Sequence, residues 1–433
     1  MRIRFKRFLT LASLLTLVLK PGPLSANPAL PSIPIKTFEV TAYGAVGDGT
    51  STNTAAIQRA IAAAAAAGGG KVVLQAGVFL CGPIRLADHV NLCVNRGATL
   101  RMLPLGKYPG GTTDPANFIS GSGLHDIAIS GSGTIDGQGI PWWPYARTPG
   151  SKRPRMIGLS SCSRILIEQV TLTNSPMFHI AIGGKSSDVT VRAVTIRANP
   201  STDPVNPSRS TDACDVSGKN ILIQDCDVSV GDDNFTCGGG TSDVLITNCT
   251  YGYGHGVSIG SYTAGGVSNI TVINCTFENT EQGIRIKSDR DRGGLVQKVS
   301  YLNLSMTNVG FPILIYGSYM ATNRDFRALN NLTARLAASY PPAEITSRTP
   351  IYRDILFSNI TATAQTGRRA GLIWGLPEMA ITNVLLERVI INADKPFGIY
   401  FAQDVRLVDS RIHTTGGLNQ LSCTNSQVTM TPQ

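Results

Sequence analysis

A regular recurrence of short β-rich segments constrains this fold more than any other feature of the sequence. Triplets rich in Val, Ile and Leu return in steps of mostly about 23–32 residues, the clearest starting at Ile165, Val189, Ile221, Val244 and Ile270. Most are followed by an Asn, Asp, Ser or Cys bend and a second short apolar segment. One such repeat cannot bury its apolar side alone, so repeats of this kind stack into a solenoid.

A right-handed parallel β-helix fits these repeats best, so we predict an all-β fold. A β-propeller is the alternative, but it would need longer repeats with four strands each. Near the N-terminus, an Ala-rich stretch after Thr52 and Asn53 predicts one capping α-helix at about residues 54–67, stopped by glycines 68–70. That helix would cover an open end of the solenoid.

The first 26 residues have the layout of a secretory signal peptide. Basic residues precede an apolar run that ends at Leu19, and the small residues Ser25 and Ala26 follow. The run is short for a membrane span, and an uncleaved anchor is the alternative. We expect cleavage near Ala26, leaving a single β-helical domain, 27–433, that is monomeric, free of the membrane, and secreted or periplasmic.

Charge and cysteine content add weaker constraints. The formal net charge is +10, and the first 26 residues hold five basic residues and no acidic one, so the mature chain carries about +5. This balance does not indicate a nucleic-acid partner and is compatible with an anionic polymer. Of nine cysteines, Cys226, Cys249 and Cys275 recur at matching places in the repeat, which predicts a buried stack of small apolar side chains.

Four polar clusters interrupt the repeats in order: Ser-Thr-Asp at 210–212, Gly-Asp-Asp at 231–233, Gly-His-Gly at 254–256 and Arg-Ile-Lys at 285–287. Equivalent residues of neighbouring coils lie about 4.8 Å apart in a parallel β-helix. The spacing therefore predicts that three carboxylates, one imidazole and two cations share one face of four consecutive coils.

Clustered carboxylates suit glycoside hydrolysis, because a second carboxyl group raises the pKa of the first and keeps it protonated as an acid. Inverting glycosidases place the two groups about 6.5–9.5 Å apart, which one or two coil spacings bracket; a retaining pair at about 5 Å stays open. The cations would bind an anionic group on the sugar. Taken singly, each cluster has an ordinary explanation as a turn, a solvated strand or a calcium site; recurrence in register favours one shared site.

Together the four motifs resemble glycoside hydrolase family 28, the polygalacturonase family, whose pattern runs Asn-Thr-Asp, Gly-Asp-Asp, Gly-His-Gly, Arg-Ile-Lys and then a tyrosine. Tyr319 matches that tyrosine best, and Tyr316 is a weaker candidate. Residues 42–61 are similar to the capping segment of many pectin-active β-helices. Residues 133–143 are similar to a further family segment, in which we expect the two tryptophans to serve packing.

The resemblance implies a role for each residue. Asp232 would be the general acid, Asp212 and Asp233 would hold the attacking water, and His255 would support the acid. A second group would bind the galacturonate that leaves: Arg285, Lys287 and Tyr319. The resemblance also implies inversion at the anomeric carbon, no metal or other cofactor, and an anionic polysaccharide as partner.

One position departs from the pattern: Ser210 stands where the family has Asn, and Ala213 where Gly is usual. Ser210 remains a candidate substrate-binding residue. Serine is shorter than asparagine and lacks the amide donors, so we expect one contact to the substrate or to a neighbouring side chain to be lost there.

The preferred function is inverting hydrolysis of α-1,4-galacturonosidic bonds in polygalacturonan or pectin. The alternatives are hydrolysis of rhamnogalacturonan or xylogalacturonan, a calcium-dependent pectate lyase, and a non-catalytic glycan-binding β-helix. The sequence does not decide between endo and exo attack. Two loops that break the repeat, 199–209 and 318–352, are candidates to wall the groove, the second with a helix expected at about residues 325–338.

Overall fold

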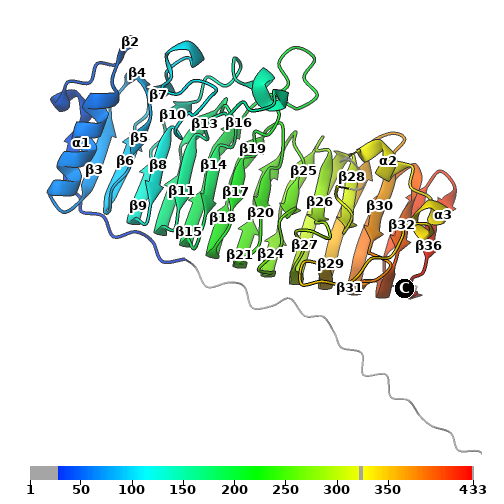
Figure 1. Cartoon of the computed structure of the whole chain (residues 1–433). Coiled ribbons are helices and arrows are strands. Elements are labelled where there is room, and N and C mark those ends of the chain that lie inside the picture. Colours follow the sequence, from blue (N-terminus) through cyan, green and yellow to red (C-terminus); the bar gives the residue numbers. More distant parts are fainter. Residues whose placement is uncertain (1–27, 321–324, 432–433) are drawn as a thin grey trace, which may run out of the picture.

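The chain is a parallel β-helix, as predicted, whose coils stack side by side along one axis (Figure 1). The computed structural model describes residues 28–320 and 325–431, so the expected signal peptide lies outside the described residues. Among the described residues, paired strands run parallel, apart from β34 (Arg411–Thr414) with β35 (Gly417–Leu418). Propeller blades are antiparallel, so that alternative is wrong. None of the described helices is long and apolar enough to cross a membrane.

Sheet B, the smaller of two sheets, receives one strand from each coil in chain order. Among the described residues its strands are β5 (Ile84–Arg85), β8 (Ile119–Ser122), β11 (Ile157–Ser160), β14 (Ile180–Gly183), β17 (Cys214–Val216), β20 (Phe235–Cys237), β23 (Val257–Ile259), β26 (Gln282–Lys287), β28 (Phe311–Tyr316), β30 (Arg369–Trp374), β32 (Lys395–Tyr400) and β36 (Leu421–Thr424).

Sheet A contains two rows of strands. The first row is β1 (Thr37–Glu39), β3 (Gly70–Leu74), β6 (Val90–Val94), β9 (His125–Ser130), β12 (Ser163–Glu168), β15 (Ser187–Arg192), β18 (Lys219–Gln224), β21 (Thr241–Thr247), β24 (Val267–Ile273), β33 (Ala402–Val408) and β37 (Val428–Thr431). The second row is β2 (Asp48–Thr52), β4 (Gly77–Cys81), β7 (Ala98–Met102), β10 (Thr134–Asp136), β13 (Thr171–Thr173), β16 (Thr195–Arg197), β19 (Asp227–Ser229), β22 (Thr250–Tyr251) and β25 (Thr276–Glu278). Three long strands run through both rows: β27 (Leu295–Val309), β29 (Ile351–Ala364) and β31 (Ile381–Asn392).

The bends of each coil use left-handed backbone, most often at Asn or Asp. Asp243 (φ 61°) precedes the apolar triplet of the first row, and Asn248 (φ 56°) turns the chain into the second row. Asn and Asp tolerate this conformation better than other residues with a Cβ. Their side chains also bridge coils, as where Asn269 Nδ2 donates to Asp243 Oδ1 at 2.6 Å.

The core between the sheets is apolar and includes the predicted cysteine stack. Cys226, Cys249 and Cys275 are buried, and each has a free thiol. Small side chains at this position let consecutive coils keep the strand spacing, which confirms the interpretation as core packing.

Helix α1 (Thr54–Ala66) covers the N-terminal end of the stack, as predicted (Figure 1). Its buried face packs on the first coil through Ile57 and Ile61. Asn53 is the N-cap residue, but its side chain makes no capping bond; Oδ1 accepts from Val46 N at 2.6 Å and Nδ2 donates to Val46 O at 3.0 Å. The Asn53 side chain therefore bonds to the loop before the helix and is not available to cap the helix.

The insertion after β28 was predicted to hold one helix over residues 325–338, and that prediction is wrong. Two short helices occur instead, α2 (Phe326–Asn330) and α3 (Ala334–Ala338). The Thr333 side chain accepts from Leu336 N and starts a new helix there. Asn330 is drawn toward the last coils, since its Nδ2 donates to Gly367 O at 3.0 Å.

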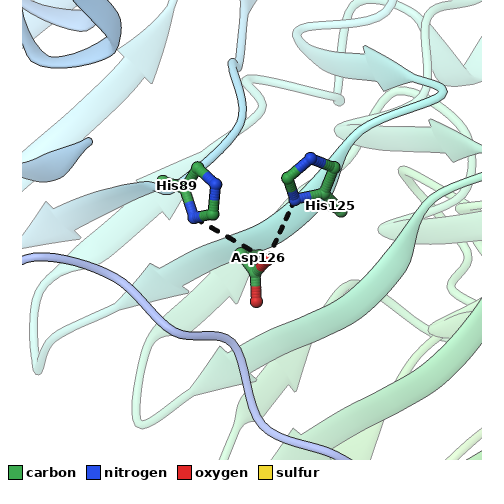
Figure 2. Close-up of side chains that lie close together, drawn as sticks. All are labelled: His89, His125 and Asp126. Atoms are coloured by element: carbon green, nitrogen blue, oxygen red, sulfur yellow. Dashed lines mark hydrogen bonds and ion pairs between the residues drawn. The ribbon is translucent and has the colours of Figure 1, made fainter. Parts of the chain in front are cut away.

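A polar cluster fastens the segment before β1 to sheet A. His89 and His125 both point at Asp126 (Figure 2), and the His125 Nδ1–Asp126 Oδ2 distance is 2.9 Å. Ser32 N donates to Asp126 Oδ1 at 2.8 Å, and Arg164 Nε donates to the same oxygen at 2.7 Å. Asp126 is thus a buried carboxylate that joins the N-terminal segment to two coils.

Replacing this carboxylate tests its structural importance. Asp126→Asn keeps the shape and suits the left-handed backbone, but it removes the charge that faces Arg164, so the free energy of unfolding should fall by about 1–3 kcal/mol. Arg164 holds the pKa of Asp126 below its ordinary range. A lowered pKa stabilises the fold above the unfolded-state value, so the difference between the two chains should be full above about pH 4 and shrink below it.

The matched control is Asp404→Asn, which lies at the equivalent left-handed position of β33 with a more exposed side chain. It should change the free energy of unfolding by no more than about 0.5 kcal/mol. Urea unfolding curves from pH 3 to 7 make the comparison. Equal effects of the two substitutions would contradict a special contribution from Asp126.

Candidate active site

The predicted site residues do come together on four neighbouring strands of sheet B: Asp212 before β17, Asp232 and Asp233 before β20, His255 before β23, and Arg285 and Lys287 within β26. The strands are in register, with Thr236 opposite Ser258 and Ser258 opposite Arg285. The backbone alone therefore fixes which side chains are neighbours.

Asp233 lies at the centre of a buried ion-pair cluster. Lys287 Nζ is 3.0 Å from Asp233 Oδ2, and the Arg285 guanidinium bonds to Oδ1. Ser258 Oγ donates to the same Oδ1 at 2.9 Å and accepts from Arg285 Nε at 3.0 Å. Asp233, Arg285 and Lys287 are all buried. The two cations therefore neutralise Asp233 when the site holds no substrate.

Asp232 is the aspartate that faces solvent. Its side chain is 26% exposed, against 4% for Asp233. His255 Nδ1 lies 3.0 Å from Asp232 Oδ1, and His255 Nε2 lies 3.5 Å from Glu281 Oε2. Ser210 N donates to Asp232 Oδ2 at 3.2 Å. One imidazole thus lies between two carboxylates, and the backbone of Ser210 orients the exposed one.

These contacts set the protonation of the pair. Burial by itself lowers the pKa of His255, but Asp232 outweighs it and raises that pKa to about 10. Burial likewise raises the pKa of Asp232, but His255 and Lys287 outweigh it and hold the pKa below the ordinary range of an aspartate. In this arrangement the shared proton therefore resides on the imidazole.

Asp212 has the opposite electrostatic environment. It is buried, and burial followed by repulsion from Asp232 and Asp233 raises its pKa well above the ordinary value. His179 N donates to Asp212 O at 2.8 Å. The buried His179 ring is kept neutral, since burial lowers its pKa to about 4. Asp212 therefore holds a proton more readily than Asp232 does.

The site opens into a groove. A hollow of about 440 Å³ lies over Asp232 and His255, between a 3-10 turn (Trp143–Arg147) and the loop that holds Ser201 and Thr202. A larger hollow of about 730 Å³ follows the sheet B face toward the N-terminal coils, past Arg155 and Asp215. The larger hollow thus spans several coils of sheet B.

The structure also shows where the aromatic side chains singled out in the sequence lie. Lys287 Nζ lies 5.3 Å from the ring centre of Tyr319, which is 9% exposed, whereas Tyr316 is fully buried. Tyr319 is therefore the better placed of the two. Trp142 is buried against Tyr108, and Trp143 Nε1 donates to Ser175 O at 2.9 Å; both rings pack, as expected.

Two groups of side chains have ligand atoms close enough to suggest a metal. Those of Asp232, Asp233 and His255 lie within 4.8 Å of one another, as do those of the cluster in Figure 2. In each group one carboxylate already uses both oxygens for cations of the chain: Asp233 for Arg285 and Lys287, and Asp126 for Arg164. The donor sets suit ion pairs better than a metal.

Sequence reasoning missed four residues that hold the site: Glu281, Ser258, His179 and Arg153. Glu281 binds His255, and Ser201 Oγ donates to Glu281 Oε1 at 2.8 Å. Arg153 donates to the carbonyl of Arg209 at 2.9 Å and so fixes the loop before Ser210. Ser258 carried a usable signal, because it falls midway between the Asp233 and Arg285 coils in register. The others carried none, since their contacts depend on how the corners fold.

Comparison with known proteins agrees with the motifs. The model for "Glycosyl hydrolases family 28" matches residues 82–334, and one for "Rhamnogalacturonase A/epimerase, pectate lyase-like" matches residues 37–99. An endo-polygalacturonase of Pectobacterium carotovorum subsp. carotovorum is 36% identical over 61% of this chain and 72% of the relative. An exopolygalacturonase of Zea mays is 30% identical over 80% of this chain and 82% of the relative.

A solved structure extends the likeness to nearly the whole chain. The polygalacturonase of Erwinia carotovora ssp. carotovora has a TM-score of 0.65 and 28% identity, covering 93% of this chain and 98% of that one. The four motifs, the β-helix and these matches agree on one family. The chain belongs to glycosyl hydrolases family 28 and is a polygalacturonase-type glycoside hydrolase.

Proposed function

We propose that the chain is an inverting hydrolase of α-1,4-galacturonosidic bonds in polygalacturonan. The observation that carries the proposal is the division of the three aspartates into one exposed and two buried ones, with the exposed Asp232 beside a histidine that carries a proton. Acid catalysis needs a carboxyl group that reaches the leaving oxygen, while the base and its water belong on the other side of the bond.

Asp232 is the proposed general acid. An incoming galacturonate brings a negative charge and displaces water, and both effects raise the pKa of Asp232. His255 Nδ1 lies 3.0 Å from Asp232 Oδ1, so a proton on that nitrogen can pass to the carboxylate as the substrate binds. Glu281 then stabilises the imidazole ring, which explains why both carboxylates face it.

Asp212 and Asp233 are the proposed pair that holds the attacking water. Asp233 is held in place by its ion pairs with Arg285 and Lys287. Asp212 is positioned one coil away, because Ala213 N donates to Asp233 O at 2.9 Å. Once Asp232 is protonated, its repulsion no longer raises the pKa of Asp212, so Asp212 can lose its own proton and act as the base. As Asp232 then gives its proton to the leaving oxygen, the ionised Asp212 takes one from the water that attacks the anomeric carbon.

The proposed substrate contacts need one refinement. Arg285 and Lys287 are buried and already paired with Asp233, so a galacturonate carboxylate would reach them only by sharing their charge beside Asp233. Tyr319, over Lys287, would border that position. We infer in addition that residues 1–26 direct export and that 27–433 act as a monomeric single domain.

The direct experiment is incubation of the mature chain with polygalacturonate and a chelator, following reducing ends, product length and the anomeric form of the first products by NMR. Hydrolysis with inversion is the expected result. Release of products that absorb in the ultraviolet would indicate a lyase instead. Parallel runs with rhamnogalacturonan and xylogalacturonan identify the polymer, and an absence of reducing ends from all three would refute the proposal.

Replacing one aspartate at a time by asparagine distinguishes the general acid from the general base. Asp232→Asn should lower kcat on polygalacturonate by about 10²–10⁴-fold, yet it should retain most of the activity on an aryl galacturonide whose leaving group needs no proton. Asp212→Asn should be inactive on both substrates. The reverse pattern would make Asp212 the acid, in line with its raised pKa without substrate. Unchanged thermal unfolding of each variant is the control.

Asp215 predicts a pH dependence of substrate binding. It is half-buried in the groove floor, and burial raises its pKa to about 6. Above that pH its charge faces an anionic polymer, so KM for polygalacturonate should rise between pH 5 and 7, by about fivefold for a repulsion on the order of 1 kcal/mol. Asp215→Asn should remove this rise, whereas Asp227→Asn, on the sheet A corner, should keep it. An unchanged profile in Asp215→Asn would contradict the prediction.

Ser210 occupies a left-handed position (φ 52°) that favours Asn over Ser. Ser210→Asn keeps the backbone bond to Asp232, and it should raise the free energy of unfolding by about 1 kcal/mol and increase kcat/KM severalfold. Ser161→Asn is the matched control, since Ser161 is an exposed left-handed serine (φ 54°) away from the carboxylates. It should stabilise equally without changing activity, and a fall of kcat/KM in Ser210→Asn would count against the site contact.

A further inference from the structure

A second polar hollow, which the proposed mechanism does not use, lies at the corner between sheet A and sheet B. It has a volume of about 590 Å³ and lies beside the start of α2. Two arginines, several amides and one exposed aromatic ring border it: Arg327, Arg368, Asn279, Asn308, Gln365 and Tyr253. Cations, amides and a ring are the groups that bind an acidic sugar.

The arginines of this corner hollow are available, whereas its acids are committed. Among the described residues, neither Arg327 nor Arg368 takes part in an ion pair, while Arg290 nearby is paired with Glu378. Asp325 accepts from Arg327 N at 2.8 Å as the cap of α2, and Glu281 is bound to His255. The hollow therefore offers positive charge to a ligand.

The hollow continues the proposed catalytic groove. Ser201 and Thr202 border both the corner hollow and the hollow over Asp232. A polymer cannot follow the sheet B face past Arg285, because the next outward residues in register, Leu314 and Leu372, are buried under the insertion. A sugar chain that continues beyond the cleavage point is directed toward the corner.

We propose that the corner hollow is a subsite for one further galacturonate unit of the polymer, whose carboxylate binds Arg327 and Arg368. The amides supply partners for the sugar hydroxyl groups: Asn308 Nδ2 donates to Asn279 Oδ1 at 2.7 Å, which holds both side chains at the corner. Tyr253, 47% exposed, offers its ring face to the sugar. The inference rests on the proposed hydrolysis of galacturonan.

The test compares substrates of two lengths. The double variant Arg327→Gln/Arg368→Gln should lower kcat/KM for polygalacturonate about tenfold, since two charge-assisted contacts are lost. For an aryl galacturonide, which has no sugar beyond the cleaved bond and so cannot reach the corner, kcat/KM should stay within about twofold. The control Arg353→Gln removes one positive charge outside the groove, on sheet A, where the guanidinium contacts Gln297, and it should change neither value.

Binding without turnover separates this inference from the proposed function. In an Asp232→Asn chain, calorimetry with a galacturonate heptamer should show affinity about tenfold weaker when both arginines are replaced, and no difference for the fully methyl-esterified heptamer. Equal binding of the acidic heptamer, or equal losses of kcat/KM on the aryl galacturonide and on the polymer, would overturn the subsite even where hydrolysis stands. Failure of the unaltered chain to hydrolyse pectic polymers would overturn the proposed function. The heptamer comparison would still show whether the corner hollow binds galacturonate.

Discussion

The parallel register of sheet B is the constraint on which the rest of the structure depends. Backbone hydrogen bonds fix Thr236 opposite Ser258, and Ser258 opposite Arg285, at one strand spacing. Residues far apart in sequence thereby become direct neighbours without any loop having to fold correctly. A site held on strand ends is also stiff, which suits chemistry that tolerates little displacement of the reacting groups.

The register brings several charged side chains together in a buried site, and a buried charge is costly unless a group of opposite charge lies beside it. Asp233 is balanced by Arg285 and Lys287, and Asp232 by His255. Asp212 takes part in none of the described ion pairs, and burial, followed by repulsion from Asp232 and Asp233, raises its pKa. The three aspartates have the same chemistry, so their separate roles come entirely from these neighbours. Burial supplies the strength of each interaction because water is excluded.

The periodic part of this architecture could be predicted from the sequence, and the aperiodic part could not. The coils, the cysteine stack and the four-coil cluster follow from spacing alone. By contrast, Asn53 has the right place for a capping residue, but its amide binds the preceding loop. The helix expected at 325–338 divides because Asn330 bonds to the last coils and Thr333 caps a new turn. Glu281 was missed for the same reason: its contact with His255 depends on the shape of a corner.

The insertion that divides into α2 and α3 links stability to the path of the substrate. Its Leu329 and Ala337 cover Leu314, Leu372 and Trp374, which would otherwise form a large exposed apolar face on sheet B. The coils toward the N-terminus carry Ser120, Gly158 and Ala181 in the same outward row and stay open. The open groove therefore ends where the fold must hide its apolar surface. A polymer held at Asp232 has free passage on one side and meets a wall on the other, so the same packing that stabilises the last coils also limits where a sugar chain can go.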